Sequence, residues 1–194
     1  IATKALGLSN QDWLWTSPNT FVASANCALY CGAKVDFVDI DPLTYNLSID
    51  CLTKKLIEAE KRNQLPKIVV AVHYAGQSCD TSKIKELAEK YHFKIIEDAS
   101  HAIGSTYKNN FVGSCEYSDI TVFSFHPVKI ITTGEGGAVC TNNKELFRKM
   151  KILRSHGIIR KDSERYNQTN EEIWNYEQID LGFNYRMTDI QAAL

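Results

Sequence analysis

The sequence predicts an α/β domain built around a largely parallel β-sheet. Three observations support this fold class. Strand-like and helix-like segments alternate along the 194 residues. The links between them are short, which favours parallel strands joined by helices that cover the sheet. Several of the strand-like segments are continuous apolar runs, typical of strands buried on both faces.

The first four elements already show the alternation. The aromatic run at 13–17 predicts a short strand. Residues 21–32 predict a helix that ends at Gly32, a residue suited to a helix C-terminal cap. Apolar residues alternate loosely over 34–41, as in a strand, and residues 48–62 have an amphipathic pattern that predicts the next helix.

The central part of the chain continues the pattern. Residues 67–73 form a continuous β-branched run and predict a buried strand. Over 81–91, apolar residues recur at helical spacing, which predicts a helix with one apolar stripe. Residues 93–98, 119–125 and 137–141 predict three further strands. Ligands in such folds bind beyond the carboxyl ends of the strands.

The last third predicts two helices and a loop. Residues 143–155 indicate a helix, and the polar stretch 160–172 indicates a long surface loop. The chain starts with Ile rather than Met, and its final residues, "MTDIQAAL", stop within a predicted helix. We therefore expect this sequence to be part of a longer protein.

Composition excludes several classes of protein. Hydrophobic residues make up 44% and the formal net charge is −1, which fits a globular protein and gives no basic surface for nucleic acid or anionic membranes. No apolar run approaches the roughly 18–20 residues of a membrane span, and no signal peptide is visible. The six cysteines include no CxxC pair, so we expect reduced thiols in a cytoplasmic protein and no metal site.

Two carboxylates end the predicted strand at 93–98. A carboxylate at the end of a buried strand is costly unless a cation or hydrogen-bond donors meet it. Asp98 can act as the cap of a following helix, a role in which Asp is favoured. It can equally be a functional group at the ligand-binding edge of the sheet, and this segment alone leaves both readings open.

Lys129 gives Asp98 a chemical context. A partly desolvated lysine can form a Schiff base with an aldehyde, and a carboxylate that faces a pyridine nitrogen keeps it protonated. Pyridoxal 5′-phosphate (PLP) needs both groups. Ser124, five residues before the lysine, offers a hydroxyl for the phosphate, and the glycines of "GEGG" after the lysine allow close turns.

Four motifs in register then resemble one enzyme family along nearly the whole chain. They are "PNTFVASAN", "EDASHAIGS", "FSFHPVKIITTGEGGAVCTN" and "LGFNYRMTDIQAAL". The chain resembles the DegT/DnrJ/EryC1/StrS family of sugar aminotransferases. Within that family, "FSFHPVK" and "LRSHGI" are most similar to the transaminases of pseudaminic acid biosynthesis, which act on a UDP-linked 4-keto-6-deoxy-N-acetylhexosamine.

The resemblance implies a role for each candidate site residue. Lys129 would hold PLP and move protons, and Asp98 would pair with the pyridine nitrogen. His101 would lie near the 3-hydroxyl of the ring, Phe21 would stack on the ring, and Ser124 would bind the phosphate.

The resemblance also implies that backbone N–H groups and a second subunit contribute to the site. Ala2 and Thr3 would form a turn that binds the phosphate through N–H groups, and Asn184 would reach the phosphate of a neighbouring subunit. Alternatives remain for three of these residues: Phe21 can be core packing, His101 can be structural, and Asn184 can cap or turn the chain.

The resemblance further implies a fold and an activity. Residues 1–194 would form the PLP-binding large domain of an aspartate-aminotransferase-like (fold type I) enzyme, a three-layer α/β/α sandwich without its N-terminal segment and C-terminal small domain. The expected reaction transfers an amino group from an amino acid donor, glutamate by resemblance, to a nucleotide-linked keto sugar within a homodimer. The alternatives are a PLP- or pyridoxamine-phosphate-dependent sugar dehydratase, in which a histidine commonly replaces the lysine, and a non-catalytic ligand-binding paralogue.

Overall fold

The computed structural model describes residues 1–159 and 176–194 and confirms the α/β class. Its central sheet has six strands in the order β2-β1-β3-β4-β7-β8. Every neighbouring pair is parallel except β7 and β8, which are antiparallel. The strands are β1 (Trp13–Thr16), β2 (Lys34–Phe37), β3 (Ile68–Val72), β4 (Lys94–Asp98), β7 (Ile120–Ser124) and β8 (Gly137–Cys140).

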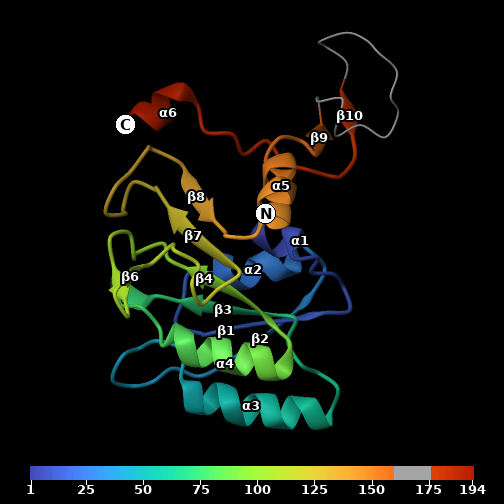
Figure 1. Cartoon of the computed structure of the whole chain (residues 1–194), viewed down its shortest axis with the longest axis vertical. Coiled ribbons are helices and arrows are strands. Elements are labelled where there is room, and N and C mark those ends of the chain that lie inside the picture. Colours follow the sequence, from blue (N-terminus) through green and yellow to red (C-terminus); the bar gives the residue numbers. More distant parts are fainter. Residues whose placement is uncertain (160–175) are drawn as a thin grey trace.

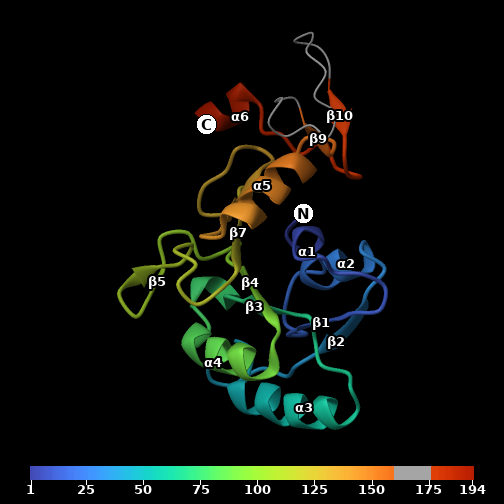
Figure 2. The same cartoon turned by 45° about the vertical axis from the view of Figure 1, so that its right-hand side comes forward.

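Helices cover both faces of this sheet, so the domain is the expected three-layer α/β/α sandwich (Figure 1). One face carries α3 (Ile49–Lys61) and α4 (Thr81–Tyr91). The other face carries α1 (Ala2–Ala5), α2 (Ala23–Leu29) and α5 (Lys144–Leu153). Figure 2 shows the sheet between the two helical layers from a second direction.

Neighbouring residues of each central strand pack into different layers. On β1, Leu14 lies in the core beneath α1, α2 and α5, whereas Trp15 lies in the core beneath α3 and α4. On β4, Ile96 and Ile95 divide in the same way. A strand that is buried on both faces needs apolar residues at every position, which explains the continuous apolar runs in the sequence.

Local hydrogen bonds set the start of one predicted helix and the end of another. Ser48 accepts a hydrogen bond from the backbone N–H of Cys51 and caps α3. Gly32 follows α2 with φ +72°, a conformation that favours glycine. The N–H of Ala33 bonds to the carbonyl of Ala28, which closes a Schellman-type end. Gly32 thus closes this helical segment as predicted, although α2 itself is shorter at both ends than the predicted range 21–32.

Short elements complete the fold. The predicted C-terminal helix is present as α6, and its N-cap Thr188 forms a capping box with Gln191. The predicted loop at 160–172 lies outside the described residues. The remaining elements were not predicted from the sequence; they are η1 (Tyr74–Gly76), β5 (Thr106–Tyr107), β6 (Asn110–Phe111), β9 (Ile158–Ile159) and β10 (Glu177–Gln178), while α6 covers Asp189–Ala193.

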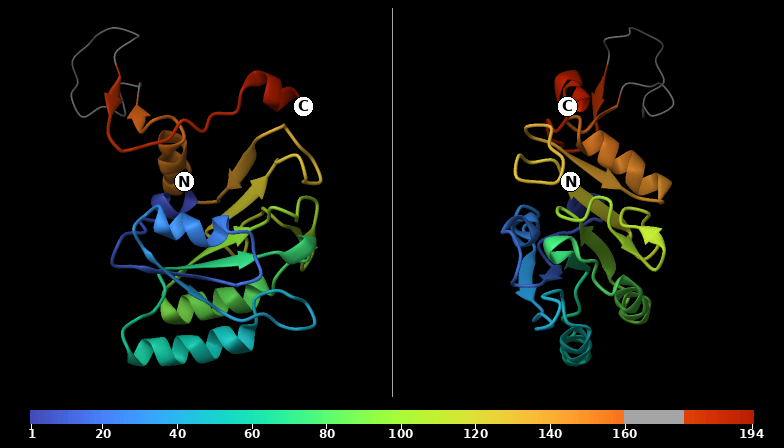
Figure 3. Two further views of the ribbon diagram at one scale, coloured as in Figure 1. Left: turned by 180° about the vertical axis from the view of Figure 1, so that it is seen from behind. Right: turned by 90° about the vertical axis from the view of Figure 1, so that its left-hand side faces the viewer.

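The segment at 176–194 returns to the body of the domain. It runs past α5 toward the edge strand β8, far from α3 and α4 (Figure 3). The side chain of Gln191 donates a hydrogen bond of 2.9 Å to the carbonyl of Glu135 there. None of the helices in the described ranges is both long enough and apolar enough to cross a membrane, and none of the six cysteines forms a disulfide.

A buried polar network stabilises the carboxyl ends of β3 and β4. Glu97 accepts hydrogen bonds from His73 Nε2 at 2.7 Å, from Thr121 Oγ1 at 3.0 Å and from Ser118 Oγ. The backbone N–H of Cys79 donates to His73 Nδ1, so the ring proton resides on Nε2 and is donated to the carboxylate. Burial pushes the pKa of Glu97 upward, but these donors outweigh it and hold that pKa below its ordinary value of 4.5.

The network predicts a pH-dependent contribution to stability. Glu97→Gln should lower the free energy of unfolding at pH 7 by about 1–3 kcal/mol, because the amide loses the charge-assisted bonds. A carboxyl group whose pKa is lower in the folded state than in the unfolded state stabilises the folded state at pH values above the unfolded pKa. This contribution is lost as the pH falls through the folded pKa. Urea unfolding at pH 7 and at several values below 4.5 measures the change. The penalty should shrink toward low pH.

The matched control is Glu89→Gln on α4, an exposed residue whose nearest cation, Lys85, lies 3.9 Å away. This variant should change stability little at any pH. A Glu97→Gln penalty of the same size at both ends of the pH range would contradict the prediction.

Candidate active site

A cavity of about 960 Å³ lies on the α1, α2 and α5 side of the sheet. Its walls come from segments that are far apart in sequence: the first residues of the chain, α2, the ends of β4 and β7, β8, α5 and residues 185–187. Its volume falls within the range of small-molecule sites. Its place beyond the carboxyl ends of parallel strands is where α/β folds bind ligands.

Asp98 lines this cavity at the end of β4. Ser24 of α2 donates a hydrogen bond of 2.6 Å to one carboxylate oxygen. Ser100 donates to the other oxygen from its hydroxyl, at 2.6 Å, and from its backbone N–H, at 3.1 Å. The two serines fix the orientation of the carboxylate. Because Oδ2 accepts only the bond from Ser24, its second lone pair can still accept a further proton donor.

Adjacent residues of β4 therefore have different surroundings. Side chains alternate between the faces of a strand, so Asp98 lies on the α2 side while Glu97 bonds to His73 on the other side. Asp98 does not cap a helix, because the nearest helix that follows it is far along the chain. Its hydrogen bond to the N–H of Ser100 is a local turn.

Lys129 lies in the turn that follows β7, beyond the same edge of the sheet. Its backbone N–H bonds to the carbonyl of His126. Its Nζ lies 2.8 Å from Nε2 of His101, in the segment that follows β4. An ammonium group has no acceptor site, so in that state Lys129 donates and the neutral imidazole accepts. The structure thus brings together two predicted site residues that are 28 positions apart.

Of the predicted site residues, Asp98, Ala2 and Thr3 line the cavity, whereas Phe21, His101, Ser124, Lys129 and Asn184 do not. Ala2 and Thr3 line the cavity, but they lie in the short helix α1 and not in a turn. Phe21 precedes α2 and is 75% exposed. Ser124, at the end of β7, accepts a hydrogen bond from the N–H of His126. Asn184 is exposed, and its backbone pairs with Ser155.

Two glycines keep the cavity open beside β8. A Cβ on Gly136 would lie 2.9 Å from Cε of Met187, and a Cβ on Gly137 would lie 2.6 Å from the carbonyl oxygen of Phe123. The side chain of Met187 can move away from a Cβ at position 136, but the backbone of Phe123 cannot move away from one at position 137, so Gly137 is the residue that lets β8 approach β7 this closely. These are the glycines that the sequence placed after Lys129.

The cavity wall has two chemically different ends. Near Asp98, burial raises the pKa of the Cys27 thiol to about 11, so this side chain is a neutral thiol at physiological pH and a poor nucleophile. At the α5 end, the wall carries the cations Lys151, Arg154 and Arg186. No group of three or more His, Cys, Asp or Glu side chains in the described ranges is arranged to hold a metal ion.

The combination fits PLP. Asp98 supplies an oriented carboxylate inside a cavity that has room for this cofactor. The amine beside an imidazole and the strand-end hydroxyl that the cofactor also requires lie outside the cavity lining, beyond the same edge of the sheet. Sequence reasoning missed Ser24 and Ser100, although both lie inside the quoted motifs. Their polarity next to apolar segments was the available signal, but the partner of Ser24 is 74 positions away.

Comparisons with known proteins identify the family of this chain. The model of the DegT/DnrJ/EryC1/StrS aminotransferase family matches residues 1–194. A UDP-4-amino-4,6-dideoxy-N-acetyl-beta-L-altrosamine transaminase of Campylobacter jejuni is 45% identical over 196 residues, which cover 100% of this chain and 47% of that protein. The chain thus spans about half the length of the curated relatives it matches.

Two solved structures have the same fold. PseC of Helicobacter pylori, an aminotransferase involved in the biosynthesis of pseudoaminic acid, superimposes with a TM-score of 0.82 at 34% identity, over 99% of this chain and 49% of that chain. NtdA of Bacillus subtilis, solved with the cofactor PMP bound, superimposes with a TM-score of 0.77 at 31% identity, over 99% of this chain and 39% of that chain.

Proposed function

The chain belongs to the DegT/DnrJ/EryC1/StrS aminotransferase family, and from this membership we propose that it catalyses PLP-dependent transfer of an amino group from an amino acid to a nucleotide-linked 4-keto-6-deoxy sugar. The amino donor is glutamate, and the product is an amino sugar for surface glycans. Residues 1–194 act as the PLP-binding large domain. The similarity to an altrosamine transaminase and to PseC supports this substrate class.

One structural observation carries the proposal. The carboxylate of Asp98 is held by two serine hydroxyls at the edge of a cavity, and the Lys129 amine meets His101 beyond the same edge of the sheet. A regulatory protein that only binds ligand has no need of an amine beside an imidazole. A lysine at position 129 also argues against the dehydratase alternative, in which a histidine takes this place.

The residues of this chain would hold PLP at its two ends. Asp98 would pair with the pyridine nitrogen. Ser124 and the backbone N–H groups of Ala2 and Thr3, which lie in the first turn of α1, would bind the phosphate. Phe21, exposed beside α2, would cover one face of the ring. When bound, PLP supplies an electron-withdrawing ring that stabilises negative charge on the carbon that loses its proton.

Lys129 is the proton carrier in this proposal. As a neutral amine, its Nζ accepts the proton that leaves the α-carbon of the amino donor. In the second half-reaction it returns a proton while the sugar receives the amino group. His101 Nε2, at 2.8 Å, holds the amine in place between these events. Asp98 keeps a fixed negative charge at the opposite end of the site throughout both halves.

We also propose a cytoplasmic homodimer with shared active sites. The six free thiols support a reducing compartment. The exposed side chain of Asn184 is available to a neighbouring subunit, and its backbone is fixed by pairing with Ser155. In a two-fold dimer the same surface serves both subunits, so each Asn184 would reach the phosphate bound by its partner.

Lys129 should be the lysine that PLP modifies. Borohydride reduction of the PLP-loaded full-length protein should fix a pyridoxyl group on Lys129, and peptide mapping identifies the site. Lys94→Ala, which removes an exposed lysine paired with Asp119 at the other end of β4, is the matched control and should keep the label. Labelling of a different lysine, or of none, would refute the assignment.

The same full-length protein should convert a keto sugar to an amino sugar. The assay combines PLP, glutamate and a panel of UDP-, GDP- and dTDP-linked 4-keto-6-deoxy sugars. Mass spectrometry distinguishes an amine product from a dehydrated one, and only the amine supports transamination.

Asp98→Asn should bind PLP but react slowly. A neutral amide no longer stabilises a protonated pyridine, so turnover should fall by about 10²-fold or more, the scale of losing an electrostatic partner in a preorganised site. Ser24→Ala is the graded comparison, because it leaves the carboxylate and removes only one of its donors. It should reduce turnover less than Asp98→Asn. Wild-type turnover in Asp98→Asn would disprove the proposed role.

Asn184→Ala should weaken PLP binding by about 1–2 kcal/mol, the scale of one hydrogen bond to a charged group. Mixing Asn184→Ala with Lys129→Ala subunits tests whether sites are shared. If Asn184 acts across the interface, one site of each mixed dimer receives both lesions and the other is wild type, so activity returns. If Asn184 acts within its own chain, no site is restored. That result, or an active monomer, would contradict the homodimer proposal.

A further inference from the structure

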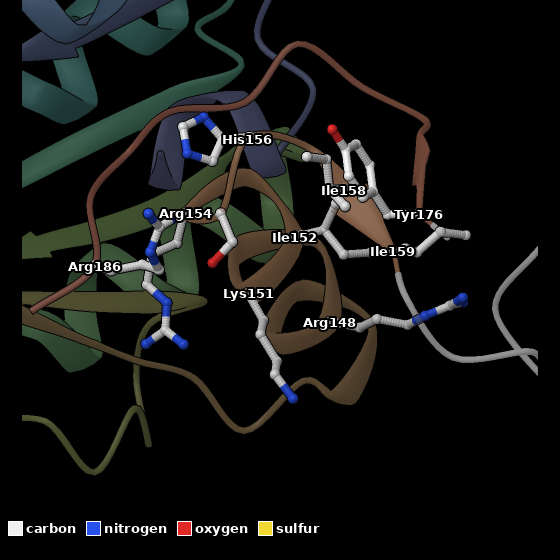
Figure 4. A pocket seen from close by; sticks show the side chains of 10 residues that line it. Arg148, Lys151, Ile152, Arg154, His156, Ile158, Ile159, Tyr176 and Arg186 are labelled. Carbon is white, nitrogen blue, oxygen red and sulfur yellow. The ribbon is translucent and has the colours of Figure 1, made fainter. Parts of the chain in front are cut away.

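A second cavity, of about 670 Å³, adjoins the first one at α5. Lys151, Arg154 and Arg186 line both cavities, and we call these three residues the cationic wall. The second cavity also has apolar surface from Ile158 and Tyr176. In Figure 4 the side chains of Arg154 and Arg186 come from neighbouring segments, and Lys151 lies earlier on α5.

The fold holds the three cations together. Lys151 and Arg154 are three positions apart at the C-terminal end of α5, a spacing that places them on the same side of a helix. Arg186 belongs to a different segment. It is held beside Arg154 by a 3.0 Å hydrogen bond from the N–H of Tyr185 to the carbonyl of Arg154. The adjoining bridge between Ser155 and Asn184 fixes the same alignment.

The three side chains of the cationic wall have no ion-pair partner in the described part of the chain, although Glu135 lines the first cavity together with them. No ion pair joins Lys151, Arg154 or Arg186 to an acid there. By contrast, Lys149, on the same helix, pairs with Glu145 at 3.0 Å. The C-terminal end of the α5 dipole stabilises cations near it. Three neighbouring positive charges in a cleft make a strong site for an anion.

We propose that the cationic wall binds the diphosphate of the nucleotide-linked substrate. The inference rests on the proposed function and adds the recognition of the substrate's charged part. A diphosphate presents several anionic oxygens on adjacent groups, and arginine forks match phosphate geometry. The sugar would extend from the wall into the cavity of Asp98, and the nucleoside would occupy the second cavity beside Ile158 and Tyr176.

The position of the cationic wall suits the binding of the substrate's diphosphate. Lys151, Arg154 and Arg186 line the cavity that contains Asp98, so a ligand held there by its diphosphate can reach the reactive end. Binding energy from a remote, non-reacting part of a substrate can be used to position the reacting part. Because the contacts are to phosphate, binding should depend on the diphosphate and weakly on the base.

The test measures nucleotide binding directly. Isothermal titration of the full-length protein uses UDP, GDP, inorganic pyrophosphate and the uncharged nucleoside uridine. Arg154→Gln and Lys151→Gln should each weaken UDP and GDP binding about tenfold or more, the loss expected for a charged hydrogen bond. Uridine binding should change little. Added salt should weaken UDP binding more in the wild type than in the variants.

Lys149→Gln is the matched control, since it removes a cation from the same helix that is already paired with Glu145. It should leave UDP affinity unchanged. Wild-type UDP affinity in both wall variants would overturn the proposal, and so would an equal loss of uridine binding. If glutamate affinity falls as much as UDP affinity, the wall serves the carboxylates of the donor and the proposal is wrong.

Two further readouts separate the remaining explanations. Sedimentation of the variants shows whether the cations serve assembly, and dissociation without a change in UDP affinity would overturn the proposal. Borohydride labelling of Lys129 reports on the proposed function independently. If Lys129 is labelled but the variants of the cationic wall bind UDP normally, only the proposed role of the cationic wall is refuted. If Lys129 is not labelled but the variants of the cationic wall lose UDP binding, the PLP chemistry is refuted and the role of the cationic wall is supported.

Discussion

The burial of β4 on both faces is the constraint on which the rest of the structure depends. A strand in the middle of a sheet covered by two helical layers can carry polar groups only at its end, where the sheet opens to the ligand side. β4 ends in two adjacent carboxylates that project to opposite faces. Glu97 is compensated inside the protein by His73, Ser118 and Thr121, whereas Asp98 is oriented by two serines and faces a cavity.

The buried network around Glu97 is connected to the strand end that carries Asp98. The backbone N–H of His73 bonds to the carbonyl of Asp98, and its side chain bonds to Glu97. The buried network on the α4 side therefore fixes the strand end from which Asp98 extends. The serines on the other side set the direction of its carboxylate. A charge that is oriented in this way needs no rearrangement when a ligand binds beside it.

The cavity itself depends on contacts between distant parts of the chain. Lys4 of α1 forms an ion pair of 3.1 Å with Asp180 and donates to the carbonyl of Leu181, which ties the first helix to the segment after β10. Gln191 ties α6 to Glu135 beside β8. These contacts bring the cationic wall and the carboxylate of Asp98 to two ends of one space. The oriented carboxylate therefore lies at one end of the cavity and the cationic residues lie at the other.

The sequence by itself determined the α/β class, the six sheet strands and the four main helices, because apolar periodicity and capping residues such as Ser48 and Gly32 act over a few neighbouring positions. It also predicted Asp98 and Lys129 as site residues, because PLP chemistry requires those residue types, and the resemblance to the family implied the others. The short strands β5, β6, β9 and β10 escaped prediction, since two residues carry no periodic pattern. Only the tertiary structure decided that Ser24 meets Asp98, that His101 meets Lys129 and that Arg186 joins Arg154. Those pairings depend on which helix covers which face and where each crossover returns, and no local pattern in the chain encodes that outcome.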